Sequence, residues 1–395
     1  MCPSMTVNYA DGATEHSYSR RQSFLRLEDF ITFDNMVAAH FRARKGKRSR
    51  HGCFLFNQSI GANCVNYVNA LLEGTYKPAP CISFEIFCTA GRKKRIITAP
   101  TYSDGVVQHL FYKALYPIFD KGFIFDSYGC RKYKGTMKAA NRTQQFVRQC
   151  PPDSYYLQID IKKYYYTINH AILRESLERK IADKRIVDYL MMFADNEAGI
   201  GLQVGCLLSQ LFGMVYLDRF DHFCKRALKA KRYIRYVDDI LFIGLTKDEA
   251  YEIKVQCETF LKRELSLSLS KWKIQKLSRG INFVGMRTWH THRLVRKRSL
   301  RTFNRALKRK RWASVSSVYA HALRTSTVKH FTAKLKQDVK ESDYPHLDGL
   351  LARALGVSRE VFKRAKINTR RRVRKIINTF TTEEAQRMIS PELKC

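Results

Sequence analysis

Residues Tyr233 to Gly244 read Tyr-Ile-Arg-Tyr-Val-Asp-Asp-Ile-Leu-Phe-Ile-Gly, with two adjacent carboxylates between two runs of β-formers. β-Branched and aromatic runs of this length are typical of strands, so the sequence predicts a β-hairpin with Asp238 and Asp239 at its tight turn. Two like charges repel each other there unless a cation is present, and Mg²⁺ prefers carboxylates together with phosphate oxygens. The pair therefore indicates phosphoryl chemistry. An ordinary exposed Asp-Asp turn is the alternative, because Asp is favoured in turns.

A third carboxylate lies upstream, near the end of another strand-like run. Residues Tyr155 to Ile161 read Tyr-Tyr-Leu-Gln-Ile-Asp-Ile, which predicts a strand that carries Asp160. When a strand, two helices and a hairpin follow one another, the strand can pair with the hairpin in one antiparallel sheet. That pairing would bring Asp160 beside Asp238 and Asp239. Three carboxylates at one sheet edge suit two Mg²⁺ ions, with Mn²⁺ as the alternative metal. The pattern favours attack of a 3′-hydroxyl on the α-phosphate of a nucleotide.

The composition indicates a polyanionic partner. The 395-residue chain carries 72 Lys and Arg against 35 Asp and Glu, a formal net charge of +37. Such an excess destabilises a compact state through self-repulsion, so a neutralising partner is expected. Nucleic acid is favoured over an anionic membrane surface, because the 12% aromatic residues offer faces on which bases stack. The length allows two or three domains, or one multi-lobed enzyme.

The cysteines and the apolar stretches bear on the compartment. None of the 11 cysteines forms a Cys-x-x-Cys pair, which argues against a zinc finger or a disulfide framework and fits a reducing cytoplasm. Met1 to Gly12 lacks the apolar core of a signal peptide. Ala198 to Leu217 is uncharged, but it contains three polar side chains (Gln203, Ser209 and Gln210) and four glycines, so a buried core segment is expected rather than a membrane span. We expect a cytoplasmic protein without a membrane partner.

Periodicity predicts further elements around the carboxylates. Helices are expected over 54–72, 104–119, 170–180, 184–194, 207–231 and 247–264, and hairpins over 82–100 and 280–289. In the first hairpin, Lys93 and Arg95 lie two residues apart and would point to one face. That face would hold a triphosphate or a nucleic-acid backbone; a charged edge that prevents aggregation is the alternative. Arg293 to Arg311 predicts a basic amphipathic helix, with a solvated face as the alternative.

These stretches resemble, in order, the sequence blocks of reverse transcriptases. Tyr-Val-Asp-Asp at 236–239 is similar to the signature hairpin of that family, and Asp-Ile-Lys-Lys-Tyr-Tyr at 160–165 is similar to its first metal-binding motif. Further blocks that resemble the family are 71–80, 93–100, 106–109, 127–135, Lys273 and 281–285. The resemblance covers roughly residues 65 to 325, and an ordered series of blocks is far more specific than one four-residue match.

The resemblance implies an α+β right-hand polymerase with fingers, a palm of antiparallel sheet plus helices, and a helical thumb. The boundaries implied are an N-terminal basic extension over 1–50, fingers over 51–150, a palm over 151–290, and a basic helical thumb with a C-terminal extension over 291–395. The activity implied is RNA-directed DNA synthesis, with template RNA, cDNA and deoxynucleotides as partners. The last 70 or so residues lie beyond the match.

Roles for single residues follow from the resemblance. Asp160, Asp238 and Asp239 would be the catalytic metal ligands, helped by the Ile161 carbonyl. Tyr165 would be an aromatic gate against a ribose 2′-hydroxyl, with core packing as the alternative. The nucleotide-binding residues implied are Lys93, Arg95, Tyr165, Val204, Gly205, Ser209, Gln210 and Lys273. The nucleic-acid-binding residues implied are Arg131, Arg296, Arg298, Arg301 and Arg305.

One block indicates a subfamily. Most bacterial reverse transcriptases carry Gln-Gly-x-x-x-Ser-Pro at the nucleotide-binding helix, whereas this chain has Val-Gly-Cys-Leu-Leu-Ser-Gln at 204–210. That variant resembles the enzymes of diversity-generating retroelements, a branch of the bacterial group II intron and retron-like reverse transcriptases. It implies a bacterial or phage-encoded enzyme that misincorporates opposite template adenines and works with a small basic accessory protein or another subunit. Gly105 departs from the pattern, because the family often has Arg there.

Two other functions stay open. The chain could be a reverse-transcriptase-like polymerase of an antiphage defence system, with a different RNA template or none, because such an enzyme shares the catalytic core. It could also be an RNA-binding scaffold with an inactive site, against which the complete set of three aspartates argues.

Overall fold

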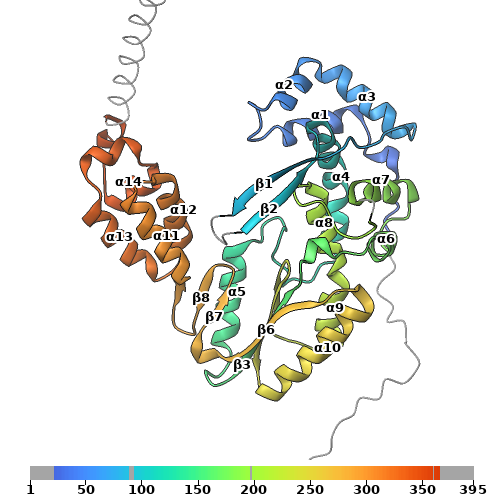
Figure 1. Ribbon diagram of the computed structural model, residues 1–395. Coiled ribbons are helices and arrows are strands. Elements are labelled where there is room, and N and C mark those ends of the chain that lie inside the picture. Colours follow the sequence, from blue (N-terminus) through green and yellow to red (C-terminus); the bar gives the residue numbers. More distant parts are fainter. Residues whose placement is uncertain (1–21, 89–92, 196–197, 359, 365–395) are drawn as a thin grey trace, which may run out of the picture. The chain divides into compact units, whose positions relative to one another are not determined.

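The computed structural model describes residues 22–88, 93–195, 198–358 and 360–364, which divide into two compact units (Figure 1). Unit 1 comprises Met1–Ala139 and Tyr155–Ile274, and unit 2 comprises Ala140–Ser154 and Gln275–Cys395. The chain therefore leaves unit 1 within helix α5 (Thr136–Arg148), returns to it at strand β3, and leaves it again within strand β6 (Leu269–Lys276). The predicted subdomain boundaries follow the sequence blocks instead and stay predictions.

The first part of unit 1 is a helical layer with one hairpin. Helix α1 packs against α4 and α3, and α2 packs against α4. The hairpin pairs β1 with β2 in antiparallel register, Ile82 opposite Ala99. The elements are η1 (Leu27–Asp29), α1 (Phe33–Ala43), α2 (His51–Gln58), α3 (Ile60–Leu72), β1 (Ile82–Cys88), β2 (Lys93–Ala99) and α4 (Tyr102–Asp120).

A four-stranded sheet forms the centre of unit 1, in the order β4-β5-β3-β6. The sheet lies in the core: Leu157, Ile159 and Ile161 of β3 are buried, and helix α10 packs against β3 and β5. Both β3 and β4 are antiparallel to β5. The elements are β3 (Tyr155–Ile161), η2 (Tyr164–Tyr166), α6 (His170–Glu178), α7 (Lys184–Ala194), α8 (Leu207–Tyr216), α9 (Asp218–Arg226), β4 (Tyr233–Tyr236), β5 (Asp239–Leu245) and α10 (Lys247–Leu265).

Unit 2 combines a small sheet with a helical bundle. Its three strands are ordered β7-β8-β9 and are antiparallel. The bundle has its own core, in which the rings of Phe303 and Phe331 stack with centroids 3.8 Å apart. The elements are η3 (Leu277–Arg279), β7 (Ile281–Phe283), β8 (Met286–Thr288), β9 (Arg293–Val295), α11 (Lys297–Lys308), α12 (Trp312–Ala322), α13 (Thr327–Asp338), η4 (Glu341–His346) and α14 (Gly349–Leu355).

Most expected elements are present, with three differences. The single helix predicted over 207–231 is two helices, α8 and α9, which meet at Leu217 (φ −87°, ψ 0°) and end at Arg226. The helix predicted over 54–72 is also two, since Ser59 adopts φ −143° and ψ 57°. The helix predicted over Arg293 to Arg311 is wrong at its start, because Arg293–Val295 pairs with β8 as strand β9 and helix α11 covers only Lys297–Lys308. No described helix has both the length and the apolar character to cross a membrane.

Candidate active site

The three aspartates lie at one edge of the four-stranded sheet. Asp160, near the end of β3, is directly opposite Asp239, the first residue of β5. Tyr236 pairs with Asp239, so Val237 and Asp238 form a two-residue turn between β4 and β5. Of the predicted turn pair, only Asp238 is therefore in the turn itself. Like charges directly opposite each other on paired strands are destabilising, so this arrangement needs a stabilising cause.

The side chains of the paired aspartates are turned toward polar neighbours. The Ser270 hydroxyl, on β6, donates to an Asp160 carboxylate oxygen and is 3.1 Å from the Asp160 carbonyl oxygen. The Gln158 amide donates to Asp239 Oδ1 at 2.8 Å. Both acceptors are carboxylates, which can also bind a cation. All three aspartates are half-buried, so none of them is enclosed in the core.

The donor set fits a hard divalent cation, because carboxylate and carbonyl oxygens are the ligands that Mg²⁺ prefers. Within the described residues, however, no three His, Cys, Asp or Glu side chains are arranged as a ready metal site. Ser270 donates to the Asp160 carboxylate and Gln158 donates to the Asp239 carboxylate, so these two side chains have different partners. Backbone placement and donor type thus fit the metal, and these two side chains must rotate to share one.

A buried ion pair supports the hairpin from behind. The Arg235 guanidinium, on β4, donates to Asp221 on α9 at 2.7 and 2.5 Å, and the Tyr233 hydroxyl donates to the same carboxylate at 2.6 Å. The guanidinium also donates to the Val237 carbonyl at 3.1 Å, inside the turn that carries Asp238. Burial opposes the charge, yet the attraction and hydrogen bonds of Asp221 raise the pKa of Arg235. Arg235 therefore stays protonated and anchors the turn.

A loop packs along the outer side of the same hairpin. The Tyr128 amide donates to the Arg235 carbonyl at 2.9 Å, and the Arg235 amide donates to the Asp126 carbonyl at 3.0 Å. Gly129 follows in this loop, and a Cβ there would lie 2.5 Å from Val237 Cγ2 and 2.7 Å from the Val237 nitrogen. Only glycine allows this approach. Sequence reasoning missed both Gly129 and Arg235, because their importance depends on which segment packs against the turn.

The three tyrosines after β3 divide between core and surface. Tyr164 is buried and its hydroxyl donates to the Gly213 carbonyl at 2.5 Å, whereas Tyr166 is 53% exposed. Tyr165 is half-buried and touches the position where a Gly213 Cβ would be, at 3.2 Å. Burial and the nearby Cys130 and Asp238 raise the pKa of Tyr165, so its phenol lies close enough to Asp238 to feel the carboxylate charge.

The 204–210 segment packs against the β1–β2 hairpin. The Thr98 amide donates to the Val204 carbonyl at 2.9 Å, and Gly205, at φ 139°, would place a Cβ 2.8 Å from the Thr98 carbonyl oxygen. Ser209 is buried and donates to the Gln203 carbonyl at 2.8 Å, while Gln210 is exposed. Of the expected nucleotide-binding residues here, Gln210 is thus open to a ligand, and Ser209 is bonded within the loop.

Gln108 fixes the start of the helix that follows this segment. Its side-chain oxygen accepts the amides of Leu207 and Leu208 at 2.9 and 3.4 Å, and so caps helix α8. The first amides of a helix have no partner within it, so a buried side-chain acceptor stabilises its start. The block at 106–109 thus has a structural role beside the candidate site.

The remaining expected residues fall into three groups. The side chains of Lys93 and Arg95 lie outside the described part of the chain. The Lys273 ammonium, on β6, lies 5.9 Å from the centroid of the Tyr156 ring. Arg131 differs from the expected nucleic-acid contact. Its guanidinium is buried and donates to Asp120 at 2.7 Å and to the carbonyls of Ile124 and Ser127 at 2.7 and 3.2 Å, so it holds the loop together.

Helix α11 of unit 2 presents the basic face that was expected. Arg298, Arg301 and Arg305 are exposed, whereas Phe303 and the apolar residues after it are buried. Residues three and four apart share one side of a helix, so these three arginines form a single stripe. Arg296 occupies the N-cap position of the helix, where its side chain makes no capping hydrogen bond, and it is half-buried.

Comparison with known proteins identifies the family. Residues 89–288, about half of the 395-residue chain, match the family described as reverse transcriptase (RNA-dependent DNA polymerase). The matched region contains β3, the β4–β5 hairpin and all three aspartates. The chain belongs to the reverse transcriptase family, which confirms the expected α+β polymerase fold and the expected enzyme class, an RNA-directed DNA polymerase.

Individual relatives are distant. Protein YkfC of Escherichia coli is 26% identical over 274 residues, which cover 58% of this chain and 70% of YkfC. The group II intron-encoded protein LtrA of Lactococcus lactis is 25% identical over 165 residues, 40% of this chain and 27% of LtrA. The chain thus spans less than a third of LtrA. Telomerase from Candida albicans superposes with a TM-score of 0.45 at 13% identity, over 67% of this chain and 55% of that one.

Proposed function

We propose that this chain extends a primer on an RNA template, with Asp160, Asp238 and Asp239 as the catalytic carboxylates. The observation that carries the proposal is the pairing of Asp160 directly opposite Asp239, with Asp238 in the adjoining turn, inside the region that matches the family. Placing like charges opposite each other costs stability, so the arrangement is best explained by a cation shared between them.

The three carboxylates and the Ile161 carbonyl would hold two Mg²⁺ or Mn²⁺ ions. When bound, such ions activate the attacking 3′-hydroxyl and stabilise the charge on the leaving pyrophosphate. To coordinate a metal ion, Asp160 would give up its hydrogen bond from Ser270. Asp239 would likewise give up its hydrogen bond from Gln158. Arg235 holds the turn carbonyl, so the position of Asp238 is set before substrate binds.

Other residues would position the substrates. Tyr165, half-buried between the Gly213 backbone and Asp238, would exclude a ribose 2′-hydroxyl. Lys93, Arg95 and Lys273 would neutralise the triphosphate of a deoxynucleotide. The arginine stripe of α11 would bind backbone phosphates of the template RNA and the cDNA, which makes that binding salt-dependent.

Within this activity we propose the mutagenic copying of a diversity-generating retroelement. The support for this proposal is the Val-Gly-Cys-Leu-Leu-Ser-Gln segment at 204–210. This segment packs against the β1–β2 hairpin, and its Gln210 is exposed. The proposal includes a small basic accessory protein. Sequencing cDNA made from co-purified RNA tests it: substitutions should concentrate at template adenines, and equal error rates at all four bases would count against it.

Primer extension tests the catalytic proposal itself. Asp238→Asn should lower the rate on an RNA template with Mg²⁺ by at least about 100-fold, because metal stabilisation of the transition state amounts to several kcal/mol and each 1.36 kcal/mol is tenfold. Asp248→Asn is the matched control, since Asp248 is an exposed carboxylate on α10. Extension by Asp238→Asn at the wild-type rate would overturn the assignment.

A further inference from the structure

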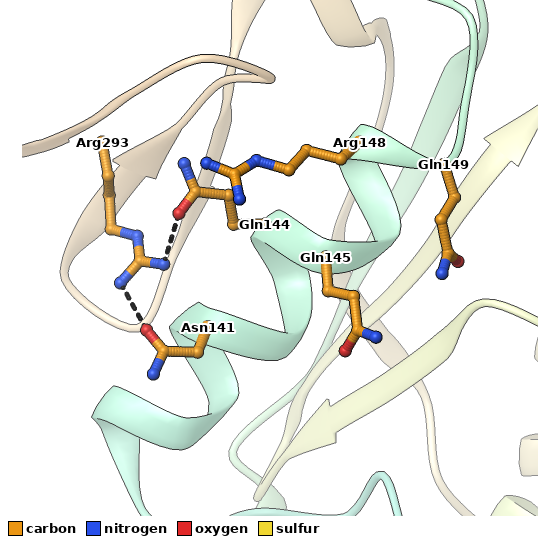
Figure 2. A pocket seen from close by; sticks show the side chains of 6 residues that line it. All are labelled: Asn141, Gln144, Gln145, Arg148, Gln149 and Arg293. Atoms are coloured by element: carbon orange, nitrogen blue, oxygen red, sulfur yellow. Dashed lines mark hydrogen bonds between the residues drawn. The ribbon is translucent and has the colours of Figure 1, made fainter.

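Unit 2 contains a polar pocket between helix α5 and strand β9 (Figure 2). Its volume is about 390 Å³. None of its lining residues belongs to the proposed active site, and every one of them carries an amide or a guanidinium group: Asn141, Gln144, Gln145, Arg148, Gln149 and Arg293. No purely hydrophobic side chain lines this cavity, and its amide and guanidinium groups favour a polar ligand.

Arg293 supplies a buried positive charge. The residue is only 5% exposed, and its guanidinium donates to Asn141 Oδ1 at 3.0 Å and to Gln144 Oε1 at 2.8 Å. Its Nε has no hydrogen-bond acceptor, and no carboxylate of the described residues pairs with it. Burial and the positive charge of Arg148 lower the pKa of Arg293, so the surroundings destabilise its charged form. A buried guanidinium without a counter-ion is costly.

The amides around Arg293 are oriented as donors. A guanidinium can only donate, so Asn141 and Gln144 must turn their carbonyl oxygens toward it and keep their NH₂ groups for another partner. Gln145 is in the same situation, because its oxygen accepts from Arg142 at 2.9 Å. Three amide oxygens near the pocket are thus already used, and the hydrogen-bond donors remain.

Arg148 adds a second guanidinium at the rim. Its side chain extends along α5 toward Gln144 and Arg293 (Figure 2). The Arg148 Nε donates to the His290 carbonyl at 3.1 Å, which orients the side chain. The two terminal guanidinium nitrogens can then donate to a ligand. The residue is exposed and forms no ion pair with a described carboxylate. The pocket therefore combines two guanidiniums, three oriented amides and no acid.

We infer that this pocket binds a phosphate group. A phosphate offers more acceptor oxygens than a carboxylate, and guanidinium groups recognise it with paired, charge-assisted hydrogen bonds. The phosphate comes either from a nucleic acid or from a free nucleotide or inorganic phosphate. The site goes beyond the polymerase function, because it shares no residue with the carboxylate edge.

Titration of the full-length protein with inorganic phosphate at constant ionic strength tests the inference. Arg148→Gln should weaken binding about tenfold or more, because it removes a charge-assisted contact at an exposed position where folding is not at risk. Lys138→Gln is the matched control: it removes the same charge from an exposed residue of the same helix, outside the pocket, and should change binding less than about twofold.

Further measurements locate the phosphate site and identify the source of the phosphate group. Phosphate should protect the amides of 141–149 and 290–295 from hydrogen exchange in wild type and not in Arg148→Gln. Arg293→Lys, which keeps the charge and loses the planar fork, should also weaken binding. Arg148-dependent binding of adenosine monophosphate indicates a small-molecule source, and Arg148-dependent binding of a short RNA alone indicates nucleic acid. Equal binding by Arg148→Gln, Lys138→Gln and wild type in every arm, or stronger binding of an acidic peptide than of phosphate, would overturn the inference. None of these readouts requires polymerase activity.

Discussion

An alanine at position 129 would place a methyl group inside the turn that carries Asp238. The new Cβ would lie 2.5 Å from Val237 Cγ2 and 2.7 Å from the Val237 nitrogen, whereas ordinary contacts begin at 3.4 Å. One of the two neighbours is backbone, so rotation of the Val237 side chain cannot relieve both contacts. The loop and the turn must therefore separate by about 1 Å, as in other overpacked sites.

Such a displacement should affect catalysis more than folding. Misplacing reacting groups by about 1 Å can lower a rate about 100-fold, and overpacking costs about 1–3 kcal/mol of stability. We expect Gly129→Ala to remain folded, to lose about 100-fold in kcat for primer extension, and to retain RNA binding. Single-turnover extension, urea unfolding and RNA binding measure the three quantities separately.

Two further variants make the Gly129 prediction specific. Gly105→Ala is the control, since a Cβ there has nothing within 4 Å and an alanine inside helix α4 should stabilise it by about 0.5–1 kcal/mol. Adding Val237→Gly to Gly129→Ala removes the clashing Cγ2 and suits the left-handed turn, so part of the rate should return. Wild-type activity in Gly129→Ala, or an equal loss in Gly105→Ala, would refute the reasoning.

Three other predictions concern neighbouring groups. Arg235→Met should destabilise the fold by about 3–5 kcal/mol, measured as the free energy of unfolding in urea, because it leaves the Asp221 carboxylate buried and unpaired; an unchanged free energy would contradict this. Tyr165→Ala should admit ribonucleotides in primer extension, and unchanged sugar discrimination would exclude the gate. Burial and the Asp221 charge raise the pKa of Asp218 to about 7, so the folded state holds this proton to higher pH than the unfolded state and stability should fall between about pH 4 and 7. Asp218→Asn should remove that part of the pH dependence of the urea midpoint, and the same slope in both proteins would show that another group causes it.

The sequence predicted those features that depend on local pattern. The strand over Tyr155–Ile161 and the hairpin around the Asp pair are visible in single runs of β-formers, and both are present. Gly129 and the Arg235–Asp221 pair were not predicted, because a glycine or a charge in a sequence does not reveal what packs against it. Arg131 was misassigned for the same reason: its partners are backbone carbonyls of a folded loop.

The backbone of the turn that carries Asp238 shows why the placement of the aspartates cannot be predicted from local sequence alone. Val237 is at φ 57°, a left-handed conformation that is a genuine outlier for a β-branched residue and costs of order 1–3 kcal/mol. Nothing in the turn itself favours that conformation. The guanidinium of Arg235 donates to the Val237 carbonyl, and Gly129 packs against the Val237 nitrogen and side chain. These tertiary contacts stabilise the strained turn, and they put Asp239 on the strand opposite Asp160 while Asp238 stays at the tip.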